Sequence, residues 1–161
     1  MLQGGHYVGF KEFEYFTYPV SVGGIVKNVT IDGTIICPWN VTGTGTAYQV
    51  SNFNCDKFVL SEGFSGTFHW TFFYYMKVKY ILFPSTIPII PNVSYAGFNT
   101  TLKVIINGSN VIPMGQQSYY NSRYNIFVYV ADSLVDAYRA DETWQTYFNT
   151  DKILPISEYT E

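Results

Sequence analysis

The strongest pattern in the chain is an alternation of apolar and less apolar residues that recurs every 24 positions. It occurs in the three segments 78–83, 102–107 and 126–131. The first, third and fifth residues of each segment are apolar, which is the period-two pattern of a half-buried strand. One strand per repeat of about 20 to 30 residues is typical of a solenoid, in which stacked repeats share one core.

This repeat divides the chain into three parts. Residues 1–27 do not match it and are rich in aromatic side chains, so we expect an N-terminal β segment with one extended strand over 6–18. Residues 28–131 form the solenoid, and 132–161 form a C-terminal helical cap with a frayed acidic tail. Because an open solenoid end exposes apolar core, the N-terminal segment either caps the first repeat or attaches the domain to something else.

Two short signals refine the first half of the solenoid. Asp32-Gly33 lies between two β-prone runs and predicts a hairpin turn. A further repeat strand is expected at 58–60, 22 residues before the matching part of the next one. These assignments extend the repeat toward the N-terminus in a degenerate form.

The segment 67–80 supports two interpretations. Its own alternation favours one long strand, whereas the repeat places a turn or a short helical piece near 71–75 and a strand from Val78. We follow the repeat, because three registered copies outweigh one local pattern.

A helix is expected over 132–140, where apolar residues recur at helical spacing. Asp132 or Ser133 can cap its first turn, and Ser133 with Asp136 forms a pair resembling a capping box. A second short helical turn is expected near 144–148.

Composition favours a single, strand-rich domain. The chain has 161 residues, which suits one domain. Charged residues make up only 13% of it and aromatic residues 19%, so the composition leans toward strands. A net charge of −3 without a basic cluster argues against nucleic-acid binding.

The sequence shows neither a secretion signal nor a membrane span. Its first residues lack the basic and apolar stretches of a signal peptide, and no run of 18 apolar residues occurs. We therefore expect either a mature fragment of a longer chain or a protein that is used without secretion. The cysteines, Cys37 and Cys55, can form a disulfide, but we favour free, partly buried thiols.

Residues suited to catalysis or metal binding are scattered. His6 and His69 are far apart in sequence, and neither has metal-ligand spacing. The close acidic pairs are Glu12/Glu14, Asp132/Asp136 and Asp141/Glu142. Their settings fit a solvated strand face, a helix N-terminus and a loop, rather than two carboxylates converging in a glycosidase cleft about 5 to 10 Å apart. We therefore predict a protein that is not an enzyme and has no catalytic residue, metal site or cofactor.

The C-terminal third carries the most specific sequence signal, in the segments 128–140, 144–147 and 153–156. These segments resemble the closing unit of BspA-type leucine-rich repeats, and 80–85 and 98–106 resemble the repeats themselves. The likeness runs from about residue 58 to 156. Ala131 departs from it, since the family usually has proline there, and this weakens the strand stop.

The resemblance implies a mainly β fold: a short BspA-like leucine-rich-repeat solenoid with one strand per repeat of about 24 residues, an N-terminal β segment and a C-terminal helical cap. Proteins of this kind fall into two groups. One comprises bacterial surface proteins used in adhesion, and the other comprises virion proteins of bacteriophages.

The repeat also predicts an apolar row on the outward face of the sheet. If the first, third and fifth residues face the core, those between them face outward, and they align because neighbouring strands lie about 4.8 Å apart. The residues that we expect to bind a partner are Lys79, Ile81, Phe83, Lys103, Ile105, Phe127 and Tyr129. A sheet face this apolar is rarely exposed to water. We therefore expect either a partner or the N-terminal segment to cover it.

Together these observations favour a non-enzymatic virion protein of a phage, in a tail, fibre or decoration, that acts through protein–protein contacts. Its partners would be other virion proteins or a host surface receptor, and a homo-oligomer is expected because virion appendages are symmetric. Nucleic-acid binding and membrane insertion are not expected. The alternative is a fragment of a bacterial cell-surface adhesin that binds host protein or glycan.

Overall fold

The computed structural model describes residues 5–7, 12–14, 26–37, 50–64, 73, 75–91, 93, 101–115 and 125–161. Its strands are β1 (Gly5–Tyr7), β2 (Glu12–Glu14), β3 (Val26–Cys37), β4 (Val50–Leu60), β5 (Tyr75–Phe83), β6 (Leu102–Ile106), β7 (Ile126–Val130) and β8 (Ile153–Pro155). Its helices are the 3₁₀ helix η1 (Asp132–Leu134), α1 (Val135–Ala140), α2 (Glu142–Tyr147), and the 3₁₀ helices η2 (Thr150–Lys152) and η3 (Ile156–Glu158).

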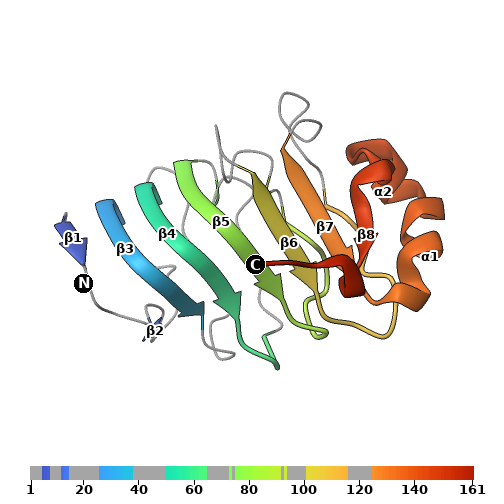
Figure 1. Cartoon of the computed structure of the whole chain (residues 1–161), viewed down its shortest axis with the longest axis horizontal. Helices are drawn as coiled ribbons and strands as arrows, with labels where there is room; N and C mark the ends of the chain where they lie inside the picture. The colour runs from blue at the N-terminus through green and yellow to red at the C-terminus, as the bar shows by residue number, and fades with distance from the viewer. Residues whose placement is uncertain are drawn as a thin grey trace.

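The described strands form one sheet in which every pairing is parallel. From β3 to β8 the order in space is the order along the chain, as Figure 1 shows. Parallel neighbours need a crossover connection instead of a tight turn, so consecutive strands are far apart in sequence. Paired residues are 24, 23 and 25 positions apart in Val26–Val50, Ile81–Val104 and Val128–Ile153. The predicted strand spacing is therefore confirmed to within one residue.

One face of this sheet carries the core. A column of side chains crosses it in register, each no more than 1% exposed: Phe58, Ile81, Val104, Val128 and Ile153. The segments after β5 and β6 add Ile90 and Met114 to the same cluster, and a parallel bridge joins these two residues. The predominantly apolar strands thus bury one side against the connections that return the chain to the next strand.

The hairpin predicted at Asp32-Gly33 is wrong. β3 runs through both residues as one strand, and its pairing with β4 shifts between Ile31 and Thr34. Gly33 has a φ of 146°, which a glycine adopts without steric cost. The Asp-Gly pair therefore accommodates an irregularity within a parallel strand, because a bulge can use a positive φ as readily as a turn can.

The strand predicted at 58–60 is confirmed as the end of β4. It is one residue out of the predicted register, since Phe58 pairs with Ile81, 23 positions on. β5 begins at Tyr75, three residues before the predicted start. The rest of the ambiguous segment lies outside the described residues except for residue 73.

The alternation predicted for β5 breaks after Val78. That residue is buried, the next two, Lys79 and Tyr80, are not, and Ile81 is buried again. Residues three positions apart cannot share one face of a regular strand, so the period of two is interrupted here. In β4 the same two-residue interruption separates the buried pair Cys55 and Phe58.

Because of this interruption, two residues of β5 were predicted to lie on the wrong face of the sheet. Ile81 and Phe83 were expected to face outward, but both are 0% exposed and belong to the core cluster. Ile81 pairs with Val104, and Leu82 pairs with Ile105. The extra outward residue in β5 has no counterpart in the shorter β6, so a uniform spacing of 24 cannot hold along both strands.

The C-terminal helices follow β7 and lie beyond that end of the sheet (Figure 1). The helix predicted over 132–140 is present as η1 followed by α1, but the predicted side-chain caps are wrong, because neither helix has a side-chain cap hydrogen bond. The second helix, α2, is capped by Asp141, whose carboxylate accepts from the backbone N–H groups of Thr143 at 2.9 Å and Trp144 at 3.2 Å. The side-chain cap is therefore on α2, for which no cap was predicted, and not on α1.

Hydrogen bonds join these helices to the segment after β6. The fully buried Trp144 donates its indole N–H to the carbonyl of Ile112 at 2.9 Å. The backbone N–H of Ile112 donates to the Tyr138 hydroxyl at 3.1 Å, and that of Met114 donates to the Thr143 hydroxyl at 3.0 Å. Three side chains of the helical segment thus satisfy the backbone of a turn that contains no regular structure.

The described N-terminal residues join the opposite edge of the sheet. β1 and β2 pair with successive parts of β3, where Gly5 aligns with Val29 and Glu12 with Thr34. The single strand predicted over 6–18 is therefore described as two short ones. Both belong to the sheet through β3, and Figure 1 shows β1 beside this strand.

Candidate functional site

The face opposite the core carries two rows of side chains, which we call the outer face. The first row follows the register across five strands: Val59, Leu82, Ile105, Tyr129 and Leu154. The second row lies beside it: Lys57, Tyr80, Lys103 and Phe127. None of these residues belongs to the core cluster. The register therefore produces an apolar row flanked by a mixed row of lysines and aromatic rings.

Four of the seven residues predicted to bind a partner lie in these rows: Lys103, Ile105, Phe127 and Tyr129. Lys79 is exposed nearby and donates to the carboxylate of Asp56 at 2.7 Å. Ile81 and Phe83 lie in the core and so cannot contact a partner in this fold. The partner-binding role of the other five stays a prediction.

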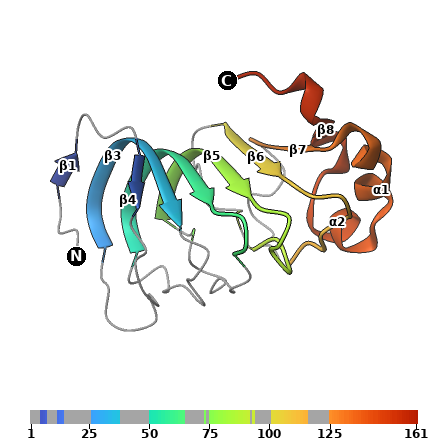
Figure 2. The same ribbon diagram turned by 90° about the horizontal axis from the view of Figure 1, so that it is seen from below.

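The C-terminal tail crosses the outer face. Figures 1 and 2 show the chain leaving η3 and running over the sheet from the β8 side toward β5. The prediction of a frayed tail is therefore wrong. The described residues 5–7 and 12–14 of the N-terminal segment pair with β3, and most of the segment that could cover this face lies outside the described residues. Ile105 and Tyr129 are only 6% and 7% exposed, although they lie outside the core cluster.

Tyr159 is the central contact of the tail. Its ring meets that of Tyr129 edge-on, with ring centroids 5.1 Å apart, and that of Tyr80 at 5.8 Å. The ammonium of Lys103 lies 5.1 Å from the centre of the Tyr159 ring. Aromatic pairs and a cation over a ring both favour this geometry, so the tyrosine is held from three sides.

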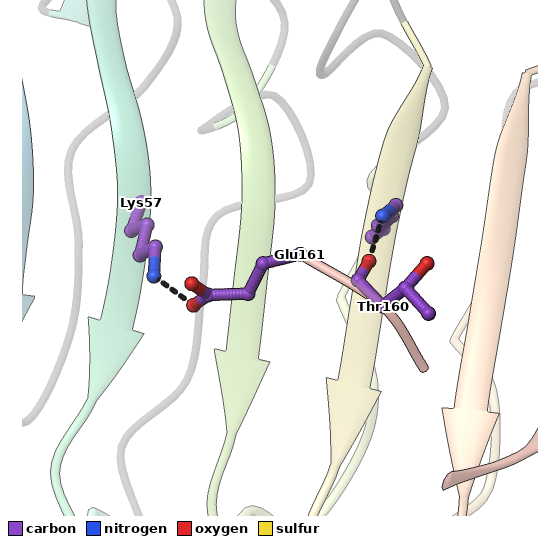
Figure 3. A network of polar contacts seen from close by, with 4 residues as sticks. Lys57, Thr160 and Glu161 are labelled. Atoms are coloured by element: carbon purple, nitrogen blue, oxygen red, sulfur yellow. Dashed lines mark hydrogen bonds and ion pairs between the residues drawn. The ribbon is translucent and has the colours of Figure 1, made fainter. Parts of the chain in front are cut away.

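Two lysines hold the residues that follow. The Lys103 ammonium donates to the carbonyl of Thr160, and the Lys57 ammonium forms an ion pair with the carboxylate of Glu161 (Figure 3). Lys57 lies on β4 and Lys103 on β6, so the tail spans the strand between them. Upstream, the Asp132 carboxylate accepts from the backbone N–H of Ser157 at 3.1 Å.

The ion pair shifts the protonation equilibria of both partners. The hydrogen bond from Lys57 lowers the pKa of Glu161, and the same bond raises the pKa of Lys57. Burial, followed by the charges of Tyr159 and Glu161, raises the pKa of Tyr80 to about 12. Near neutral pH the lysine and the carboxylate are therefore charged, and the tyrosine remains a neutral hydroxyl.

A groove of about 590 Å³ remains beside the docked tail. Strands β4 and β5 contribute Lys57 and Tyr80 to its walls, and the tail contributes Tyr159 and Glu161. Lys103 of β6 completes this part of the lining. The outer face thus offers aromatic rings and ammonium groups to a ligand of complementary chemistry.

Sequence reasoning missed the other residues of this site. They are Lys57, Val59, Tyr80, Leu82 and Leu154 of the sheet, and Tyr159, Thr160 and Glu161 of the tail. Tyr80 and Leu82 were assigned to the core because the alignment ignored the interruption in β5. A spacing of 23 between β5 and β6, where the repeat gives 24, would have placed Tyr80 beside Lys103. Nothing in the local sequence of Tyr159 indicates that it returns to the sheet.

Other reactive groups offer less. Among the described residues, no three His, Cys, Asp or Glu side chains are grouped as a metal site. Cys55 is a free, buried thiol whose pKa is raised by burial and by the nearby charge of Asp56, so it is a poor nucleophile. The side chains of His6 and His69 lie outside the described part of the chain.

Comparisons with protein-family models, curated proteins and solved structures found no match to this chain. Within the described residues, no helix is both long and apolar enough to cross a membrane.

Proposed function

We propose that this protein is a non-enzymatic binding module that acts through protein–protein contacts on the outer face of its sheet. The observation that carries the proposal is the pair of rows on that face, where apolar, aromatic and lysine side chains lie in register over four or more strands. Protein interfaces combine an apolar and aromatic centre with a polar rim, and this face has both.

The proposed architecture is a short leucine-rich-repeat-like solenoid with a helical C-terminal cap. Its support is the strand order: from β3 onward each strand pairs with the next one in the chain, and paired residues are about one repeat apart. A terminal cap must cover the last core residues of such an array. The buried Trp144 and its bond to the Ile112 carbonyl suit α2 to that role.

The proposed setting is a bacteriophage virion, as a tail, fibre or decoration component whose partners are other virion proteins or a host surface receptor. This rests on the resemblance to BspA-type repeats and on a face suited to symmetric assembly. The alternative is a fragment of a bacterial surface adhesin. Aromatic rings beside lysines also suit an adhesin that binds host protein or an acidic glycan.

Light scattering of the purified chain tests the proposal first. A closed oligomer would have a mass that is a multiple of 18.4 kDa. If Leu154→Asp on the outer face dissociates it into monomers, the result would support assembly through this face. An oligomer that survives this substitution would contradict use of the outer face. A monomer would favour the adhesin, and detection of the chain in envelope fractions instead of purified phage particles would confirm that alternative.

A further inference from the structure

The docked tail shows which chemistry the outer-face groove accepts. Three consecutive residues dock along its edge, and each meets a different feature: the ring of Tyr159 meets two tyrosines, the Thr160 backbone carbonyl meets Lys103, and the Glu161 carboxylate meets Lys57. The threonine contributes only its main chain to these contacts. The recognised pattern is therefore an aromatic residue, any residue, and an acidic residue.

The backbone of the tail is extended at this point. Tyr159 has φ −68° and ψ 128°, which is an extended conformation, and the side chains of residues 159 and 161 both contact residues of the sheet. Two side chains of an extended segment can then face the sheet together while the carbonyl between them remains free to accept a hydrogen bond. The groove is thus shaped to read a short extended peptide.

The ion pair at Glu161 contributes little to the docking of the tail. The Glu161 side chain is 73% exposed and that of Lys57 39% exposed, and ion pairs in such settings contribute little to stability. Ordering these residues on the sheet also costs conformational entropy, which opposes docking. The groove of about 590 Å³ beside the tail leaves room for a longer segment.

We propose that this groove binds an extended acidic peptide of a partner protein, with an aromatic residue two positions before a carboxylate, and that residues 159–161 are its intramolecular competitor. The inference rests on the proposed function as a protein-binding module. The complementary charges are already present: Lys57 pairs with the Glu161 carboxylate and Lys103 donates to the Thr160 carbonyl, so the tail shows how an acidic segment meets the two lysines. Displacement of the tail by a partner would uncover Tyr80 and Tyr129 for the same contacts.

Fluorescence anisotropy with a labelled hexapeptide of residues 156–161 tests this directly. The full chain is compared with Tyr159→Ala/Glu161→Ala, which releases the tail, and with Thr160→Ala, which keeps the backbone carbonyl. We expect the released-tail variant to bind the peptide at least about tenfold tighter than the parent, and the Thr160→Ala control to match the parent. Equal binding by all three proteins would refute competition by the tail.

The lysines are tested in the released-tail background. Lys57→Glu and Lys103→Glu should each weaken peptide binding about tenfold or more, because each reverses a charge that meets the peptide. Lys77→Glu makes the same change at an exposed position of β5 outside the groove and should leave binding unchanged. A peptide with glutamine in place of its last glutamate should bind less tightly to the released-tail protein. Retained affinity in the Lys57 and Lys103 variants would overturn the assignment of the groove.

Two further measurements distinguish a partner peptide from other ligands of the groove. They also distinguish failure of this inference from failure of the proposed function. Binding of an acidic oligosaccharide such as oligogalacturonate, without binding of the peptide, would overturn the peptide assignment. If the parent chain forms dimers and the free peptide dissociates them, the result would support the peptide assignment. It would also identify the partner as the tail of a second copy. If the chain assembles through its outer face but the released-tail variant ignores the peptide, this inference fails while the proposed function stands.

Discussion

At the scale of single residues, the identity of the buried face depends on one position in β5. Ile81 and Ile105 occupy matching places in the predicted repeat, yet Ile81 lies in the core cluster and Ile105 lies on the outer face. Both are almost completely buried, so exposure alone does not distinguish them. Their surroundings do, because one is packed inside the protein and the other lies on the face that the tail crosses.

The matched pair Ile81→Asp and Ile105→Asp tests this assignment. A carboxylate at position 81 has no partner in an apolar core, so we expect a loss of more than about 4 kcal/mol or failure to fold. At position 105 the charge can reach water once the tail moves away, so the fold should survive with a smaller loss. Urea denaturation followed by circular dichroism measures both, and equal losses would mean that the two faces were assigned wrongly.

The cap of α2 gives a second prediction at this scale. Asp141→Ala removes the acceptor for two backbone N–H groups and should lower the free energy of unfolding by about 1 kcal/mol. Asp136→Ala, at an exposed position of α1, should change it by less than about 0.5 kcal/mol. Equal effects of the two substitutions in urea denaturation would show that the cap is not the stabilising feature.

At the scale of elements, the helical segment is joined to the sheet through a turn. Its tryptophan satisfies the carbonyl of Ile112, and a buried carbonyl without a partner is costly. Trp144→Phe should therefore destabilise the protein by about 1 to 3 kcal/mol. Tyr147→Phe on the same helix is the control and should be nearly neutral, since Tyr147 packs against the core without filling it. A neutral Trp144→Phe in thermal and urea denaturation would contradict the proposed cap.

Strands are also the elements that the sequence predicted best. Period-two patterns located β6 and β7, and the long spacing excluded simple hairpins between them. The Asp-Gly turn signal failed at Asp32-Gly33, and the period-two pattern failed at Lys79-Tyr80. In both places a strand accommodates an irregularity without ending. A bulge leaves little trace in one sequence, because its residues are ordinary and its effect is to shift everything after it.

The candidate site was predictable only in part, for the same reason. Ile105 and Tyr129 were placed correctly because β6 and β7 are regular. Tyr80 was misplaced by the irregularity in β5, and Tyr159 could not be placed at all. Its contacts depend on where the chain turns after η3, and no local pattern encodes a contact between residues 30 or more positions apart.

At the scale of the whole molecule, the tail links the two halves of the sheet. Glu161 meets Lys57, 104 positions earlier in the chain, on a strand four places from β8. The contact depends on an ionised carboxylate, because the pKa of Glu161 is lowered when the tail is docked. Its contribution is therefore fully present above the ordinary pKa of the group and is lost as the pH falls through the lowered value.

Acid should thus release the tail before the sheet unfolds. We expect the NMR signals of the Tyr159 ring to move toward their unstructured positions as the pH falls below the ordinary value of 4.5. The pKa of Asp132, which holds Ser157, is also lowered and titrates in the acidic range. Glu161→Gln separates the two, since it should abolish the step that belongs to the ion pair. An unchanged titration in this variant would assign the step to Asp132.

The order of the strands has a consequence for synthesis. During translation, each strand from β4 to β7 emerges after the neighbour on which it pairs, so the sheet can lengthen by one strand at a time as the chain leaves the ribosome. In every such pairing the two strands are separated by a similar number of residues in the sequence. Each new strand can therefore find its neighbour over a short length of chain. The exposed growing edge is a hazard until Trp144 and the helices around it are made. A nascent chain from which β7 has emerged but β8 has not would therefore hold a nearly complete sheet with an open edge, and such chains should be the ones that most need a chaperone.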